Sequence, residues 1–292
     1  KVEWMGRDTS TLVMCGNVAV SVNGLHMSAL KGQGGGDGFV CVGAADGATL
    51  SLECCDLSCE GSAVVQIGGA FTKATVFGCC IHDGNGAGVF IGGRAQAELE
   101  KNDIHSHALT CVQVQDEGSE AILRGNRIYH GAQAGVYVFD KAKATLENNS
   151  IRSHLRAGIR VDDCCEVMMT GNRICDGKAN GVLIGNDCTC VLEANIIADN
   201  DCVGVGMYQG TATLTNNTIK GNGQCNIKRT AEQLAAWHPD WIAAYHAGGM
   251  RGVSAKNGSS LFCPPGCNTI ESNGKVSWGC TVEQVFFDES CT

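Results

Sequence analysis

The sequence repeats itself every 22 to 24 residues over more than half of its length. One leucine or isoleucine marks each copy, and successive markers are 24, 23, 24, 23, 23, 23 and 22 residues apart. The markers are Leu57, Ile81, Ile104, Ile128, Ile151, Ile174, Ile197 and Ile219. A second apolar residue follows each marker after eight positions, and in most copies a third comes two positions later, as at Val136 and Val138. This alternation is typical of a half-buried strand.

The repeat unit predicts an all-β fold built of stacked coils. Each copy ends in a further strand pattern such as "ATLENN", and the copies lack helical periodicity. Three short strands per coil predict a right-handed parallel β-helix, a solenoid of about nine coils that includes an upstream coil with the strand "GFVCVG". Asparagines such as Asn126 and Asn149 stand two residues before the markers, so we expect them to form a hydrogen-bonded ladder along a turn.

The repeat stops near Thr230. We therefore expect residues 1–230 to form the β-helix and residues 231–292 to form a helical, cysteine-containing C-terminal cap. The segment "AEQLAAWHPDWIAAYHAGGM" has helical composition and places Trp237, Trp241 and Tyr245 four residues apart. Such a helix would cover the open end of the solenoid, which is otherwise an exposed sheet edge. A helix that binds a partner is the alternative.

Charge and cysteine content restrict the partners and leave the compartment open. The net charge of −9 argues against nucleic acid as a partner, and no run of 18 apolar residues predicts membrane insertion. The 19 cysteines are odd in number and show no paired CxxC motifs, so both buried thiols and disulfides remain open. An intracellular location is favoured over secretion.

The outward position of the second strand forms one column along the predicted solenoid. Its members are Gln66, Phe90, Gln113, Tyr137, Arg160, Leu183, Gly206 and Lys228. Amide, aromatic and guanidinium groups on one flat face are suited to holding an extended protein or glycan chain. We predict that Phe90, Gln113, Tyr137 and Arg160 bind such a ligand.

An acidic column lies at the turn that follows the second strand. It contains Asp116, Asp140, Asp163 and Asn186, with Asp162 and Asp187 beside it. Carboxylates stacked at ~4.8 Å repel one another unless solvent, a proton or a cation intervenes. A solvated turn is the favoured interpretation, and a Ca²⁺ site formed by Asp116, Asp140 and Asp163 is the alternative. No other cofactor is expected.

The histidines also fall into columns. His82 and His105 share one repeat position, and His107 and His154 share another. Two histidines one coil apart can bind a metal, but no carboxylate pair is in obvious register with them. We therefore expect them to lie in polar surface turns.

The repeat resembles a known family. The unit from Gly125 to Asn148, "GNRIYHGAQAGVYVFDKAKATLEN", resembles the parallel β-helix repeat (PbH1) of the pectin-lyase-like superfamily. It is most similar to the β-helix arm of F-box proteins and to the carbohydrate-binding and sugar-hydrolase repeats of NosD-like proteins. The resemblance spans roughly residues 50–225 and implies the fold more than the function. For the F-box arm it implies a protein partner and membership of a larger assembly.

A shorter resemblance concerns catalysis. "VFD" followed by "VDDC" resembles the polygalacturonases, and this implies that Asp140, Asp162 and Asp163 are catalytic acids and bases. The chain departs from that family at "IGNDC", where a Gly-His-Gly motif is missing, and it lacks the Arg-x-Lys clamp. We therefore favour a non-catalytic recognition or scaffold module that binds an extended protein or glycan. The alternative is a polysaccharide-active enzyme, a glycoside hydrolase, lyase or epimerase, that uses the stacked aspartates.

Overall fold

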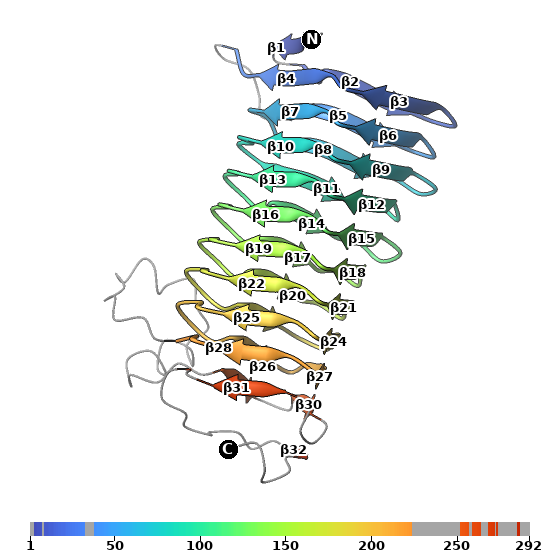
Figure 1. Cartoon of the computed structure of the whole chain (residues 1–292). Coiled ribbons are helices and arrows are strands. Elements are labelled where there is room, and N and C mark those ends of the chain that lie inside the picture. Colours follow the sequence, from blue (N-terminus) through green and yellow to red (C-terminus); the bar gives the residue numbers. More distant parts are fainter. Residues whose placement is uncertain are drawn as a thin grey trace.

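The chain winds into a parallel β-helix, seen in a computed structural model as a rod of stacked coils (Figure 1). The structure describes residues 3–7, 9–32, 38–223, 252–256, 259–263, 268–271, 273 and 285–286. These residues form three parallel sheets of 11, 10 and 11 strands, and no helix occurs among them. Each coil adds one strand to each sheet, so the predicted all-β solenoid of about nine coils is confirmed.

Sheet A contains the strands that carry the repeat markers. In stacking order they are β1 (Glu3–Arg7), β4 (His26–Leu30), β7 (Asp56–Cys59), β10 (Cys80–His82), β13 (Asp103–His105), β16 (Arg127–Tyr129), β19 (Ser150–Arg152), β22 (Arg173–Cys175), β25 (Ile196–Ala198), β28 (Thr218–Lys220) and β31 (Thr269–Glu271). Ile128 pairs with Ile104 and with Ile151, and all three are fully buried. The predicted register of the markers is therefore confirmed.

Sheet B contains the second strand of each repeat. Its strands are β2 (Leu12–Cys15), β5 (Val40–Ala45), β8 (Ala63–Gly68), β11 (Ala87–Ile91), β14 (Val112–Val114), β17 (Val136–Val138), β20 (Ile159–Val161), β23 (Val182–Ile184), β26 (Val205–Tyr208) and β29 (Val253–Lys256). The upstream copy predicted at "GFVCVG" is β5, where Val42 pairs with Val65. Side chains alternate between the core and the outside, as Val136, Tyr137 and Val138 show.

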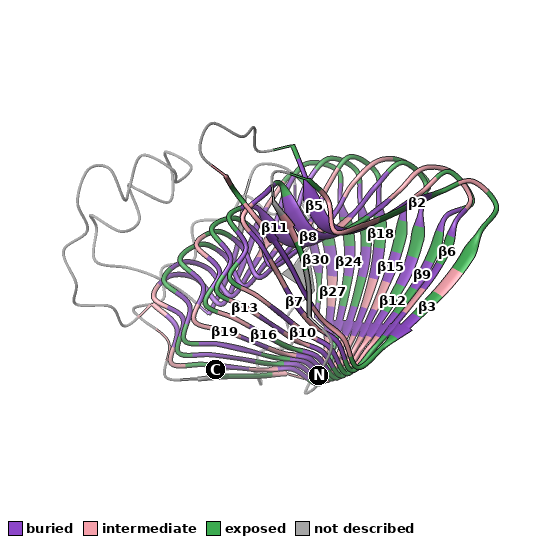
Figure 2. Ribbon diagram, turned by 90° about the horizontal axis from the view of Figure 1, so that it is seen from above, coloured by how far each residue is buried: buried purple, intermediate pink, exposed green. Residues whose placement is uncertain are grey.

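Sheet C completes each coil. Its strands are β3 (Ala19–Asn23), β6 (Thr49–Glu53), β9 (Lys73–Phe77), β12 (Gln96–Glu100), β15 (Glu120–Arg124), β18 (Lys143–Glu147), β21 (Glu166–Thr170), β24 (Thr189–Glu193), β27 (Thr211–Thr215), β30 (Ser260–Phe262) and β32 (Val285–Phe286). Figure 2, seen from above, shows the buried positions of successive coils lying over one another. One aliphatic core therefore runs through the rod.

The predicted asparagine ladder fills the corner between sheets C and A. Nδ2 of Asn126 donates to Oδ1 of Asn149 at 2.9 Å and to the backbone oxygen of Leu99 at 2.8 Å. The same pattern repeats from Asn102 to Asn217 and continues to Asn268. Each buried amide thereby satisfies its neighbour, which is worth about 1 kcal/mol net per hydrogen bond.

A second buried ladder lies at the corner between sheets A and B, and it corrects the prediction for two histidines. His107 and His154 are 2% and 0% exposed, so they do not lie in surface turns. His154 accepts the backbone N–H of Gly131 at Nδ1 and donates from Nε2 to the backbone oxygen of Ile128, both at 3.1 Å. A Cβ at Gly135 would come within 2.6 Å of His154 Nε2, so the ladder requires a residue without a side chain there.

Further strands extend the sheets at both ends of the rod. The first residues form β1 and β2, which extend sheets A and B, and β29, β30 and β31 add a coil after residue 251. Residues 224–251, which include the expected helix with Trp237, Trp241 and Tyr245, lie outside the described residues. The division at residue 230 and the helical cap therefore stay predictions. In the part of the chain that the structure describes, no helix is long and apolar enough to span a bilayer.

Candidate functional site

The predicted outward column forms one straight file on sheet B. Phe90 pairs with Gln113, Gln113 with Tyr137, and Tyr137 with Arg160 in the parallel register. The file continues through Leu183 to Gly206, but the next member is Ser254, since β26 pairs with β29. Lys228, which the repeat spacing placed there, lies outside the described residues. The repeat spacing did not predict this pairing, because a long segment of sequence separates β26 from β29.

An aromatic and cationic cluster occupies the middle of this file. The rings of Tyr137 and Phe139 are stacked with centroids 4.5 Å apart. The guanidinium carbon of Arg160 lies 4.9 Å from the centroid of the Tyr137 ring. A cation over an aromatic face is an attractive arrangement that holds both side chains in place. The cluster therefore presents a preformed surface between two neighbouring coils.

Asp162 holds this cluster in place through hydrogen bonds to Tyr137 and Arg160. Its Oδ2 accepts hydrogen bonds from the Tyr137 hydroxyl at 3.2 Å and from Nε of Arg160 at 2.5 Å. The carboxylate is 5% exposed, and its Oδ1 has no hydrogen-bond partner among the described residues. Gly185 on the next coil makes room for this oxygen, because a Cβ there would lie 2.0 Å from it. The site thus pairs a buried carboxylate with a half-buried guanidinium and a phenol.

The protonation states of the cluster follow from this burial. Burial raises the pKa of Tyr137 to about 12, although Arg160 opposes the shift. Burial and then the Asp162 charge also raise the pKa of Tyr208 at the end of β26. Burial alone would lower the pKa of Arg160, but Asp162 and Tyr137 outweigh it and raise that pKa. Near neutral pH the cluster therefore offers phenol donors and a fixed cation.

The acidic column divides into one buried residue and several turn residues. Asp140 and Asp163 are exposed and have left-handed backbone φ angles of 55° and 60°, a conformation that aspartate adopts readily. Asp116, with φ of 74°, accepts the backbone N–H of Gly93 at 2.7 Å through Oδ2. Of the predicted catalytic residues, Asp162 alone is buried beneath Arg160, and Asp140 and Asp163 remain in the solvent-exposed turn. Their catalytic role stays a prediction.

The predicted calcium ligands do not form a ligand cluster in the described chain. Within that part, the one group of three or more histidine, cysteine or acidic residues whose ligand atoms gather within 4.8 Å consists of Asp56, Cys80 and His82. Asp116, Asp140 and Asp163 do not belong to it. Calcium binding by these aspartates therefore stays a prediction.

A second column of polar and aromatic side chains runs along the outward face of sheet A. His82, His105 and Tyr129 stack with centroid distances of 5.6 and 4.8 Å, and the guanidinium carbon of Arg152 lies 4.6 Å from the Tyr129 centroid. No carboxylate is directly in register with His82, which pairs with Ser58 and His105, but carboxylates lie at the neighbouring register position, and Asp56 contacts the His82 ring from there. Asp56 and Asp103 both pair with Cys80, two residues before His82. The signal was readable, because each aspartate stands directly before a repeat marker.

This architecture of three parallel sheets around one aliphatic core defines the class of right-handed parallel β-helix proteins. The family model described as "Right handed beta helix region" matches residues 15–161, and the chain belongs to this family. The model of the periplasmic copper-binding protein NosD matches residues 110–234. No curated protein sequence matches the chain significantly.

Solved structures share the fold at low sequence identity. The A-module of the Azotobacter vinelandii mannuronan C-5 epimerase AlgE4 has a TM-score of 0.51 and 13% identity, over 90% of this chain and 91% of that one. The AlgE6 A-module from the same organism has a TM-score of 0.51 and 11% identity, over 90% and 89%. A mutant of the periplasmic alginate epimerase AlgG has a TM-score of 0.52 and 10% identity, over 94% and 76%. These similarities establish the fold alone.

Proposed function

We propose that this chain is a recognition module that binds an extended glycan along the outward file of sheet B. The observation that carries the proposal is the single file from Phe90 through Gln113 and Tyr137 to Arg160, with one outward side chain per coil. Proteins that act on mannuronan and alginate use the same fold, which supports a linear saccharide as the ligand. An extended protein segment is the alternative ligand class.

The spacing and chemistry of the file suit a polymer. Coils rise by about 4.8 Å, so successive side chains meet successive units of an extended chain laid along the rod. The Tyr137 and Phe139 rings offer apolar faces to sugar C–H groups, and Gln113 and Arg160 offer hydrogen-bond donors to sugar oxygens. Asp162 already holds Tyr137 and Arg160 in place, so ligand binding loses less side-chain conformational entropy.

Charge sets the preferred position of an acidic sugar. Arg160 is the one cation in the described part of the file, in a chain whose net charge is −9. Arg160 contacts Asp162 through Nε, and among the described residues no other ion pair engages its guanidinium nitrogens. A uronate carboxylate therefore fits opposite Arg160, with neutral contacts on either side.

The test is a binding measurement with purified chain and defined oligosaccharides. Oligomannuronate, oligogalacturonate and cello-oligosaccharide separate acidic from neutral ligands. We expect Tyr137→Ala to weaken binding about tenfold, since an aromatic contact contributes about 1.4 kcal/mol. Tyr137→Phe should retain most of the affinity. Met168→Ala on the outward face of sheet C, where the side chain is 53% exposed, is the matched control. Equal affinities for Tyr137→Ala and Met168→Ala, or no bound glycan, would reject the proposal.

A second candidate function is a polysaccharide lyase or epimerase, and Asp162 favours it. The buried carboxylate of Asp162, whose Oδ1 has no hydrogen-bond partner among the described residues, lies beside a protonated phenol and a guanidinium. Proton removal next to a uronate carboxylate needs a base, an acid and a cation of this kind. Incubation with polymannuronate should then yield an unsaturated product, detected by ultraviolet absorbance, or epimerised residues, detected by NMR. Both should vanish in Asp162→Asn and persist in Asp140→Asn.

A further inference from the structure

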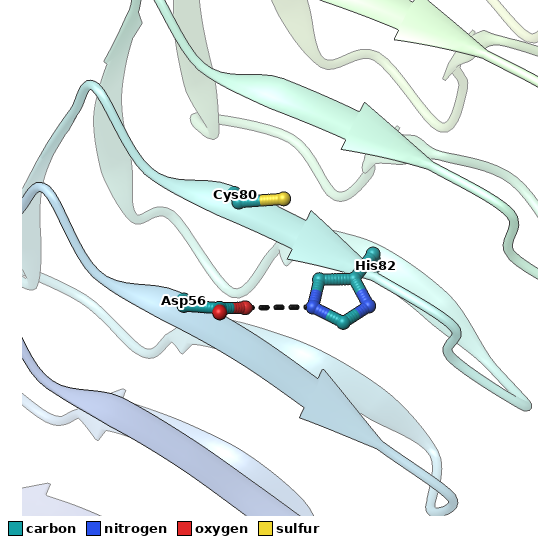
Figure 3. A group of neighbouring side chains, drawn as sticks. All are labelled: Asp56, Cys80 and His82. Carbon is teal, nitrogen blue, oxygen red and sulfur yellow. Dashed lines mark hydrogen bonds and ion pairs between the residues drawn. The ribbon is translucent and has the colours of Figure 1, made fainter. Parts of the chain in front are cut away.

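The first coils carry a compact group of three different metal-ligand side chains on the outward face of sheet A. Asp56 comes from β7, and Cys80 and His82 come from β10 on the next coil (Figure 3). One ligand atom from each residue lies within 4.8 Å of the other two, and all three residues are partly buried. The parallel register places Cys80 beside Asp56, so the backbone fixes their separation.

The imidazole of His82 is oriented by carboxylates on both sides. Its Nδ1 lies 2.8 Å from Oδ2 of Asp83, and its Nε2 lies 2.7 Å from Oδ1 of Asp56. Metal-binding histidines commonly donate the proton of one ring nitrogen to a carboxylate, which turns the lone pair of the other toward the ion. Asp83 is placed to play that supporting part, and Nε2 then faces the group formed with Asp56 and Cys80.

The three side chains differ in chemistry and converge from two neighbouring coils. Oδ1 of Asp56 lies 2.7 Å from Nε2 of His82, and Oδ2 of Asp56 lies 3.0 Å from Nδ1 of His26. One carboxylate, one thiol and one imidazole are therefore held together by the backbone register. A divalent cation bound among them would replace the proton of the thiol, because metal ions bind cysteine as the thiolate.

We propose that Asp56, Cys80 and His82 bind a divalent transition metal, with Zn²⁺ as the best match. Thiolate and imidazole ligands select Zn²⁺ over Ca²⁺ or Mg²⁺, and three protein ligands leave one tetrahedral position open. Binding forms a metal–sulfur bond, and the proton of the Cys80 thiol goes to the buffer. Ligand atoms around tetrahedral zinc are roughly 3.5 Å apart, so the 2.7 Å contact between His82 and Asp56 opens as the ion enters.

This site is independent of the glycan file. It lies on sheet A, and its three residues precede residues 110–234, which match the copper-binding family model. Glycan binding and metal binding can therefore fail separately.

The experiment is a cobalt titration of the full chain after chelation under reducing conditions. We expect one Co²⁺ to produce an intense ultraviolet thiolate charge-transfer band and visible bands of tetrahedral cobalt, both displaced by Zn²⁺ and unaffected by Ca²⁺. Cys80→Ser should abolish the charge-transfer band, and Cys54→Ser, which alters an exposed thiol in the adjacent turn, should leave it unchanged.

Asp83→Asn gives a second readout that does not depend on losing a ligand. This exposed carboxylate only supports His82, so the variant should retain the band and bind Co²⁺ about tenfold to a hundredfold more weakly. Circular dichroism checks that each variant folds. A charge-transfer band that survives Cys80→Ser, the absence of any such band in the unmodified chain, or unchanged affinity in Asp83→Asn together with Asp56→Asn would overturn the proposal.

Discussion

Two pairs of histidines occupy neighbouring places in the coil and have opposite environments. His82 and His105 stand one residue after a marker, on the outward face of sheet A. His107 and His154 stand three residues after a marker, where the chain turns inward, and both are buried. Carboxylates surround His82, whereas His154 contacts backbone groups alone among its hydrogen-bond partners. Two positions that are only two residues apart in the coil therefore give a histidine different roles: one holds a buried structural imidazole, and the other holds an imidazole in contact with solvent and carboxylates.

The two environments shift the histidine pKa in opposite directions. Burial lowers the pKa of His107 and of His154 to about 4, so both are neutral at physiological pH. Burial alone would lower the pKa of His82, but hydrogen bonds to Asp83 and Asp56 outweigh it and raise that pKa. The same side chain is thus a fixed part of the core in one place and a proton acceptor in the other.

The largest expected effect is the loss of a buried imidazole. His154→Ala removes the partner of the Gly131 N–H and of the Ile128 carbonyl, and it leaves a cavity, so we expect about 3 kcal/mol of destabilisation. His154→Asn should cost less. Two coils further along the same ladder, Asn200 makes the equivalent contacts with Gly177 and Ile174. Urea denaturation measures both. His105→Ala on the outward face should cost under about 0.5 kcal/mol, and an equal cost at both positions would contradict the comparison.

The second prediction concerns acid. A buried histidine with a folded pKa of about 4 contributes stability above the unfolded pKa of 6.5, and this contribution is lost as the pH falls from 6.5 toward 4. At 1.36 kcal/mol per pH unit the loss is on the order of 3 kcal/mol for each histidine. Denaturation midpoints between pH 7 and pH 4 should therefore fall less steeply in the His107→Asn/His154→Asn double variant. Identical pH profiles would show that other groups govern acid unfolding.

The smallest predicted effect has the opposite sign of pH dependence. The raised pKa of His82 means that its stabilisation is complete below pH 6.5 and disappears as the pH rises through the folded pKa. Because His82 is partly exposed to solvent, we expect no more than about 1 kcal/mol. His82→Gln should thus lower stability at pH 5.5 and leave it unchanged at pH 9. An NMR titration of His82 that gives a pKa below 6.5 would contradict this prediction.

The sequence predicted the coils and their register because backbone pairing forces equivalent residues into one file. The markers Ile104, Ile128 and Ile151 and the outward file from Phe90 to Arg160 follow directly from the spacing. The ligand role of that file remains a prediction. The register after β26 was not predictable, since residues 224–251 separate it from the strand with which it pairs.

Corner residues were harder to place than strand residues. Asp162 and Asp163 are adjacent in sequence, yet one is buried under Arg160 and the other is exposed. Their difference depends on the left-handed backbone at Asp163, which turns the chain away from the face. Spacing shows which residues share a column, but the corner geometry decides which way each side chain points. The Asp56, Cys80 and His82 group was not predicted because Asp56 pairs with Cys80, and its carboxylate reaches the His82 ring two residues further along the strand.

The stacking of self-contained coils has a consequence for how such a rod can change in length. Duplication or deletion of one whole coil preserves the aliphatic core and the asparagine ladder, since each amide of that ladder makes the same contacts with the coils before and after it. A site formed by side chains from two adjacent coils is different, because an extra coil inserted between them would move those side chains about 4.8 Å further apart. Growth by gene duplication is therefore tolerated along most of the axis and forbidden between β7 and β10 and between β17 and β20, where Asp56 meets His82 and Tyr137 meets Arg160.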